Sequence, residues 1–290
     1  MELDQEILKK VKLIEIHAKR MVDEVTAGQY KSHFKGQGVQ FSEHRTYVPG
    51  DDIRHIDWKV SARTKDPMVK KYDEERELVV FLIVDLSASG EFGTKFKLKS
   101  EVAAEVSAML AYAASHTGDK VGALIFTSDV EKIVPPKKGR SHVLRIVRDV
   151  LTHKPKNKTT DLKKALEVSE RLLKHKGIVF IISDFLTEGY EHVLKRVARR
   201  HEVVALNVLD GHEWSMPEDM GRVLFENPET GEEFWVDTSQ YAFKEWYKKF
   251  KQKHREKLTE FFNKNRIEEV TIDAREDYAE TLVRFFGRRR

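Results

Sequence analysis

The sequence predicts an α/β fold, built on a doubly wound and mostly parallel β-sheet. Two continuous apolar runs, Leu78–Val84 and Ile178–Ile182, have the composition of strands that are buried on both faces of a sheet. Segments with helical spacing separate such runs, as the crossover helices between parallel strands require. With 290 residues, the chain has room for one sizeable core with attached elements.

Strands and helices are expected to alternate along an α/β domain at residues 78–290. The expected strands lie at 78–85, 120–127, 131–134, 177–184, 201–210 and 267–272. The expected helices lie at 97–116, 141–151, 161–175, 190–200 and 240–265, with a last one ending near 286. A turn rich in proline and glycine separates two short runs within residues 221–238, which predicts a β-hairpin insertion there.

Two further segments precede this domain. Residues 1–27 have the apolar spacing of an amphipathic helix. Residues 28–77 are punctuated by glycine and proline and hold few apolar side chains, which predicts short strands and turns. We expect this second segment to pack on the α/β domain as a small β-rich accessory, anchored by Phe41, Tyr47, Ile56 and Trp58.

The composition narrows the classes of function. Lysine and arginine number 52 against 48 aspartates and glutamates, with both signs interleaved, so nucleic-acid binding has little support. The chain contains no cysteine, which excludes a disulfide scaffold, a thiolate metal site and a cysteine nucleophile. No apolar run approaches the roughly 20 residues that cross a bilayer, and the N-terminus lacks the pattern of a signal peptide. We therefore expect no intrinsic membrane anchor and a cytoplasmic location.

Hydroxyl and carboxyl side chains follow the predicted strands at three places. Asp85, Ser87 and Ser89 follow the first buried strand, Thr160 precedes a helix, and Asp184 ends the strand of residues 177–184. Ligands of open α/β sheets bind beyond the carboxyl ends of the strands, where these side chains are expected to meet. Their oxygen atoms are of the kind that Mg²⁺ or Mn²⁺ prefers. Taken alone, Asp after a strand, or Thr160 before a helix, is equally well explained as a helix cap.

The pattern resembles the metal-ion-dependent adhesion site (MIDAS) of von Willebrand A domains. In that motif, a D-x-S-x-S loop, a later threonine and an aspartate after a middle strand surround one Mg²⁺. The resemblance implies that Ser87 and Ser89 bind the metal directly, and Thr160 directly or through water. Asp85 and Asp184 would mostly hold metal-bound waters. The family's aspartate is commonly followed by glycine, whereas Phe185 follows it in this chain.

The segment before the first buried strand resembles a bacterial family known as domain of unknown function 58. That family shows the pattern G-x-G-x-x-F-x-x-x-R-x-Y-x-x-G-D-x-x-R-x-I-D-W-x-x-x-A-R before a von Willebrand A-like domain. The matching residues are Gly36, Gly38, Phe41, Arg45, Tyr47, Gly50, Asp51, Arg54, Ile56, Asp57, Trp58, Ala62 and Arg63. This resemblance implies a protein partner, either a MoxR-type AAA+ ATPase or a client of that ATPase.

An enzyme is the main alternative to a binding module. A Mg²⁺-dependent phosphotransferase or phosphatase would use Asp85 as its nucleophile, but haloacid-dehalogenase-like enzymes need a second aspartate where Ser87 stands. Neither Ser87 nor Ser89 lies in the G-x-S-x-G turn of a serine hydrolase. We therefore expect a non-enzymatic, metal-dependent module for protein–protein interaction.

Other features of residues 28–77 admit simpler interpretations. The Gly-Gln-Gly turn at residues 36–38 lacks the Gly-Lys-Ser/Thr of a phosphate loop. His33, His44 and His55 lie near acidic residues but fit no usual zinc spacing, which favours surface hydrogen bonding. Three arginines and three aspartates of this segment are predicted to form an ion-pair network: Arg45, Arg54, Arg63, Asp51, Asp52 and Asp57.

Overall fold

The computed structural model divides the chain into two compact units. One unit comprises Lys31–Leu78, and the other comprises Met1–Tyr30 together with Val79–Arg290. The structure describes residues 9, 11–16, 19, 40–64, 66–73, 78–87, 98–210, 221–226 and 233–288.

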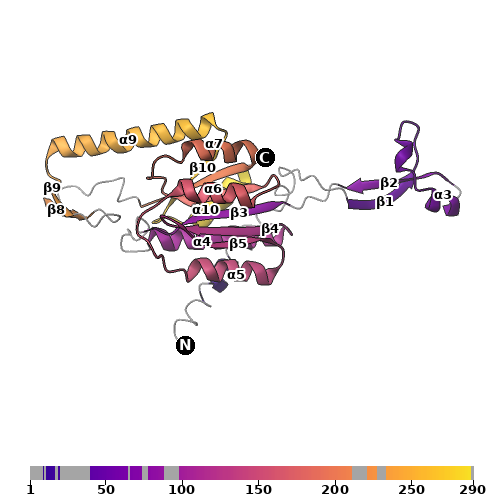
Figure 1. Ribbon diagram of the computed structural model, residues 1–290, viewed down its shortest axis with the longest axis horizontal. Helices are drawn as coiled ribbons and strands as arrows, with labels where there is room; N and C mark the ends of the chain where they lie inside the picture. The colour runs from indigo at the N-terminus through magenta and orange to yellow at the C-terminus, as the bar shows by residue number, and fades with distance from the viewer. Residues whose placement is uncertain are drawn as a thin grey trace. The chain divides into compact units, whose positions relative to one another are not determined.

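The larger unit is organised around a six-stranded sheet (Figure 1). Its strands are β3 (Val79–Asp85), β4 (Lys120–Phe126), β5 (Val130–Lys137), β6 (Ile178–Ser183), β7 (Glu202–Leu209) and β10 (Glu268–Asp273). They lie in the order β10-β7-β6-β3-β4-β5, and all neighbouring pairs are parallel except β4 and β5. The two central strands, β3 and β6, are the apolar runs of the sequence, and they lack exposed residues because helices cover both faces. The predicted mixed α/β fold with a mostly parallel sheet is confirmed.

Helices pack on both faces of this sheet (Figure 1). They are α4 (Lys99–His116), α5 (Arg140–Leu151), α6 (Leu162–Leu172), α7 (Glu191–Arg200), α9 (Tyr241–Lys264) and α10 (Tyr278–Arg288). One core joins α6, α7 and the C-terminal half of α9 to Phe81, Ile83 and Val179. Phe180, next along β6, points to the other face and contacts Phe286 of α10, with 6.3 Å between ring centroids. Successive residues of a strand alternate in this way, so a strand covered on both faces must be apolar throughout.

The edge strand β5 is longer than predicted and runs antiparallel to β4. It contains Pro135 and Pro136, and the register shifts between the partners of Val121 and Ala123 opposite these prolines. Proline has no backbone N–H and is tolerated in a sheet at an edge or a bulge. The proline pair therefore explains why the sheet ends at β5.

Three smaller observations concern the hairpin, the N-terminal segment and membrane-spanning helices. The predicted hairpin is present, with β8 (Arg222–Glu226) antiparallel to β9 (Glu233–Asp237). Residues 9, 11–16 and 19 are helical, as expected of the N-terminal segment, and Ile14 is buried. Among the described residues, no helix has the length and hydropathy needed to cross a membrane.

The smaller unit holds one antiparallel strand pair and two short helical elements. These are β1 (Gln40–Thr46), β2 (Met68–Asp73), the 3₁₀ helix η1 (Ile53–His55) and α3 (Trp58–Thr64). Strands and turns were predicted, whereas α3 was not. Val69 is the only buried hydrophobic residue among those described in this unit, in agreement with a segment poor in core.

Polar contacts dominate the smaller unit. Arg45 donates two hydrogen bonds of 2.7 Å to Asp51, and Arg54 pairs with Asp52 at 3.0 Å, as the predicted network requires. Asp57 differs from the prediction, because it pairs with His44 at 3.1 Å and with Lys70 at 3.3 Å. These contacts, the His44 hydrogen bond first, lower the pKa of Asp57 to about 2.

The four predicted anchors of this segment differ in their exposure. Trp58 is 70% exposed, so its own unit leaves most of the side chain uncovered. It begins the short helix α3, whose described side chains include none that is buried. Tyr47 and Ile56 are partly buried, and the side chain of Phe41 lies outside the described residues. Packing of this segment on the α/β domain stays a prediction.

Candidate metal centre

The candidate site lies where the winding of the sheet reverses. From β3 the chain proceeds to β4 and β5 on one side, whereas β6, β7 and β10 extend the sheet on the other side. Asp85 is the last residue of β3, and Asp184 directly follows β6. The two strands are parallel neighbours, with Val84 opposite Ile182, so both carboxyl groups reach the same edge. Such a switch point is the usual ligand crevice of an open α/β sheet.

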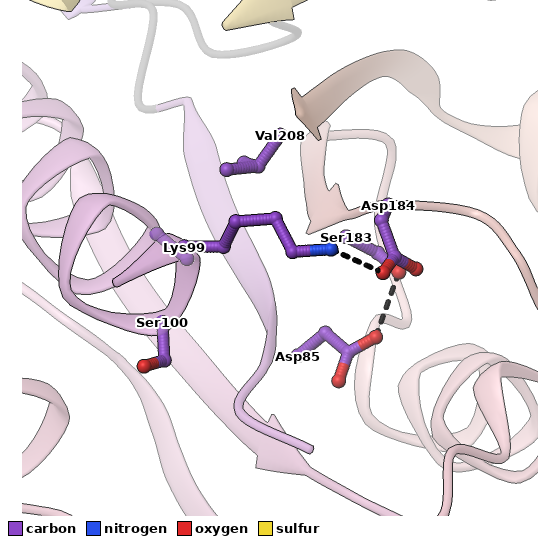
Figure 2. Close-up of a pocket in the computed structure, with 7 residues that line it drawn as sticks. Asp85, Lys99, Ser100, Ser183, Asp184 and Val208 are labelled. Carbon is purple, nitrogen blue, oxygen red and sulfur yellow. Dashed lines mark hydrogen bonds and ion pairs between the residues drawn. The ribbon is translucent and has the colours of Figure 1, made fainter. Parts of the chain in front are cut away.

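The carboxyl group of Asp85 is held by two hydrogen bonds. The backbone N–H of Ser87 donates to Oδ1 at 3.0 Å. The hydroxyl of Ser183 donates to Oδ2 at 2.7 Å (Figure 2). Ser183 Oγ in turn accepts a hydrogen bond from the N–H of Phe185 at 3.2 Å. These bonds orient Asp85 within a buried site, because its side chain and those of Ser87 and Ser183 are all shielded from solvent.

Thr160 reaches the site from the loop before α6. Its hydroxyl donates to Ser87 Oγ at 2.7 Å, which joins two of the predicted ligands directly. The neighbouring Asp161 is the N-cap of α6, since its side chain accepts from the N–H of Lys164 at 3.0 Å. The N–H of Asp161 also donates to the carbonyl of Thr127 at 2.9 Å, just past β4. Asp161 therefore caps the helix, and the Thr160 hydroxyl is directed to Ser87.

Asp184 pairs with a buried lysine that the sequence analysis did not single out. Lys99 Nζ lies 3.1 Å from Asp184 Oδ2, and the side chains are 3% and 6% exposed, respectively (Figure 2). The other oxygen of Asp184 accepts from the N–H of Leu186 at 3.2 Å. Lys99 is the first residue of α4, where a positive charge opposes the helix dipole. This unfavourable position is the one feature of the local sequence that indicates a role for Lys99.

The site retains unrelieved negative charge despite Lys99. Burial, followed by repulsion from Asp184, raises the pKa of Asp85 to about 6, while hydrogen bonds from Ser87 and Ser183 act in the opposite direction. Beside these groups lies a cavity of about 20 Å³, enough for one water molecule. Its lining residues are Asp85, Lys99, Ser100, Ala103, Ser183, Asp184 and Val208.

Phe185 gives the loop after Asp184 an unusual backbone. Its φ angle is 55°, in the left-handed region that favours glycine. The ring is fully buried and lies 5.3 Å from the Phe262 ring of α9 and 6.2 Å from the Tyr190 ring, measured between centroids. Aromatic burial offsets the cost of the conformation, which accounts for phenylalanine at a position where the backbone favours glycine.

Four of the five predicted ligands therefore converge: Asp85, Ser87, Thr160 and Asp184. Ser89 lies outside the described residues. The donor set is made of oxygen atoms and includes only two carboxyl groups. No cluster of three or more His, Asp or Glu side chains suited to a metal occurs in the described part of the chain. Oxygen donors with residual negative charge fit a hard cation such as Mg²⁺ or Mn²⁺.

Comparisons with known proteins identify a matching family model and similar proteins. The family model described as "Protein of unknown function DUF58" matches residues 43–257. The uncharacterized protein Rv1480 of Mycobacterium tuberculosis is 32% identical over 292 residues, which cover 99% of this chain and 91% of the relative. The uncharacterized protein YeaD of Bacillus subtilis is 29% identical over 104 residues, which cover 36% of this chain and 24% of YeaD.

Solved structures with similar chains include BatB from Bacteroides thetaiotaomicron and the SpRpn10 VWA domain. For BatB, the TM-score is 0.47 at 14% identity, covering 73% of this chain and 98% of that one. For the SpRpn10 domain, the TM-score is 0.41 at 10% identity, covering 71% of this chain and 93% of that one. Likeness at this level carries no argument about function.

Proposed function

We propose that this chain, which belongs to the family described as protein of unknown function DUF58, has a von Willebrand A-like domain with a metal-dependent binding function. The protein would be a non-enzymatic module that binds a partner protein through one Mg²⁺ or Mn²⁺. The observation that carries this proposal is the convergence of Asp85, Ser87, Thr160 and Asp184 at the switch point of the sheet.

These residues would divide the work of holding the ion. The hydroxyls of Ser87 and Thr160, already in contact, would bind it together with Ser89, and Asp85 and Asp184 would accept hydrogen bonds from its waters. A cation held largely by neutral hydroxyls keeps residual positive charge, which an aspartate or glutamate of a partner can complete. Burial, followed by repulsion from Asp184, raises the pKa of Asp85, and a nearby cation would favour its ionised form.

Lys99 adds a condition to metal binding. In the metal-free protein, its ammonium group supplies the positive charge next to Asp184, within a hydrogen-bonding distance of 3.1 Å. A divalent ion at the site would meet this charge and must weaken or displace the ion pair. We therefore expect moderate affinity for the metal alone, with the partner's carboxyl group supplying the remaining free energy.

The geometry favours binding over the alternative of a phosphotransferase or phosphatase. A nucleophilic aspartate must present an ionised oxygen to the phosphorus atom. Asp85 is buried, and both of its oxygens accept hydrogen bonds from Ser87 and Ser183.

The proposed partner is a MoxR-type AAA+ ATPase or its client, in the cytoplasm. The chain contains no Walker-type phosphate loop, so energy from ATP would come from another protein. An adaptor or co-chaperone of this kind needs only a surface that recognises a carboxyl group and depends on the metal.

Calorimetric titration of Mg²⁺ and Mn²⁺ tests the metal site. Asp85→Ala is expected to weaken binding by at least about tenfold, because it removes an anchor for the metal's waters. Asp129→Ala is the matched control, since Asp129 is an exposed carboxylate past β4 that pairs with Lys164. Equal affinities in the wild type and Asp85→Ala would refute the assignment.

Capture of the candidate ATPase tests the binding role. The wild type with Mg²⁺ is compared with the wild type in chelator and with the double variant Ser87→Ala, Ser89→Ala. Capture is expected only in the first condition. Unchanged capture in all three would exclude recognition through the metal.

A further inference from the structure

An exposed aromatic surface lies at the hairpin and the N-terminal half of α9. Five large aromatic side chains are exposed among the described residues, and four of them fall within residues 235–250. Their exposed fractions are 69% for Trp235, 77% for Tyr241, 58% for Trp246 and 53% for Phe250. We call these four residues, together with Phe243 and Tyr247, the aromatic surface. In Figure 1 the hairpin strands β8 and β9 are drawn beside the start of α9.

The two halves of α9 have different surroundings. Leu258 and Phe262 of the C-terminal half are buried in the core, and they are the only buried residues of the helix. Phe243, Trp246, Tyr247 and Phe250 recur at the spacing of one helix face. A face of this kind normally packs against an apolar partner. Among the described residues, the core cluster includes side chains from the C-terminal half of α9 alone.

Aromatic rings on α9 pack against one another. Trp246 stacks on Phe250 with 5.6 Å between centroids and an interplanar angle of 17°, and Phe243 lies 5.8 Å from Trp246. Phe243 also stacks on Tyr247 at 6.1 Å. The Trp246 ring thus lies between two neighbours, unlike the open ring faces on which nucleic-acid bases stack.

Positive charge is concentrated on the same segment. Residues 241–257 contain seven lysines and arginines against two glutamates, a net charge of +5 over 17 residues. The whole chain carries only +4, so the remainder is close to balanced. Lys251 Nζ lies 5.5 Å from the centroid of the Tyr247 ring, which shows cations and aromatic rings interleaved on the helix.

We propose that the aromatic surface binds the surface of an anionic lipid bilayer. Tryptophan, tyrosine and phenylalanine favour the boundary between headgroups and acyl chains, where their rings are apolar and their polar tips stay hydrated. Lysine side chains extend past such rings to the headgroups, and each basic residue near an anionic leaflet adds attraction. The helix would lie in the plane of the membrane, in a peripheral and reversible association.

Co-sedimentation with lipid vesicles tests this proposal. The full chain in chelator is mixed with phosphatidylcholine vesicles that either contain or lack phosphatidylserine, and tryptophan fluorescence is recorded in parallel. Chelator separates the result from the metal site, so either proposal can fail alone. Binding is expected only to vesicles with phosphatidylserine, with a blue shift of the emission and a loss of binding at high salt.

Two variants localise the contact. Trp246→Ser with Phe250→Ser is expected to weaken vesicle binding by about tenfold or more, because it removes two interfacial rings. Trp58→Ser is the matched control, since it removes a comparably exposed tryptophan from the other unit and should bind as the wild type does.

Several results would overturn the proposal. One is an absence of binding to anionic vesicles, and another is equal binding by the double variant. Self-association of the wild type that is lost in the double variant, without vesicle binding, would assign the surface to a second copy of the chain. Saturable capture of single-stranded nucleic acid in place of vesicles would assign it to nucleic acid.

Discussion

Replacing Asp85 by asparagine is expected to stabilise the metal-free protein at neutral pH. Burial and Asp184 raise the pKa of Asp85 from 3.8 to about 6. At about 1.4 kcal/mol per unit, this shift lowers the free energy of unfolding at pH 7 by about 3 kcal/mol. An amide carries no charge to desolvate, and its oxygen still accepts from the Ser87 N–H while its NH₂ can donate to Ser183 Oγ.

The sign of the pH dependence follows from which state holds the proton. Below about pH 4, Asp85 is protonated in both the folded and the unfolded chain. Between about pH 4 and pH 6, the folded chain keeps the proton that the unfolded chain has lost, so stability falls as the pH rises. Above about pH 6 the loss is complete. The benefit of Asp85→Asn therefore grows through this window and is largest at pH 7.

Urea unfolding in chelator measures the effect. The wild type, Asp85→Asn and the control Asp129→Asn are compared near pH 4 and at pH 7, and the difference between wild type and variant isolates this group from the others. A variant that is less stable than the wild type at pH 7, or a difference that does not change with pH, would refute the reasoning. Excess Mg²⁺ should stabilise the wild type more than Asp85→Asn.

Three further substitutions test other parts of the site. Lys99→Met is expected to tighten Mn²⁺ binding by at least about tenfold in calorimetry, because the metal no longer competes with the ion pair to Asp184. The same substitution should destabilise the metal-free protein by about 3 kcal/mol, because it leaves Asp184 without that partner. Equal metal affinity would contradict the role given to Lys99. Phe185→Gly relieves the strain of the positive φ but removes the ring that contacts Phe262. The free energy of unfolding in urea is therefore expected to fall by about 2–4 kcal/mol. A rise in that free energy would show that strain outweighs packing. Asp161→Ala removes the N-cap of α6 and should cost about 1 kcal/mol in thermal unfolding; an unchanged midpoint would argue against the cap.

Much of the fold is predictable because the information is local. Residues 79–84 and 178–182 are continuously apolar, and a strand covered on both faces tolerates little else. Parallel strands end at one edge of the sheet, so the polar residues that follow β3 and β6 had to meet there. For that reason Asp85 and Asp184 could be paired from the sequence, although 98 residues separate them.

Other features depended on contacts that no local pattern encodes. Lys99 and Asp184 are 85 residues apart, and only the position of α4 over the ends of β3 and β6 brings the ammonium group to that carboxylate. The sequence left open whether Thr160 caps the following helix, and the hydrogen bond from the Lys164 N–H shows that Asp161 is the cap. Trp58 has the bulky aromatic side chain expected of an anchor, yet its own unit leaves it exposed.

The long helix α9 shows most clearly where sequence information ends. Its apolar spacing is helical throughout, so the sequence by itself determined that residues 240–265 form a helix with an apolar side. Periodicity identifies the apolar face of the helix, but it carries no information about whether another part of the chain packs against that face. Tertiary packing buries Leu258 and Phe262 and leaves Trp246 and Phe250 exposed, because the described residues of the core cluster include side chains from the C-terminal half of the helix alone.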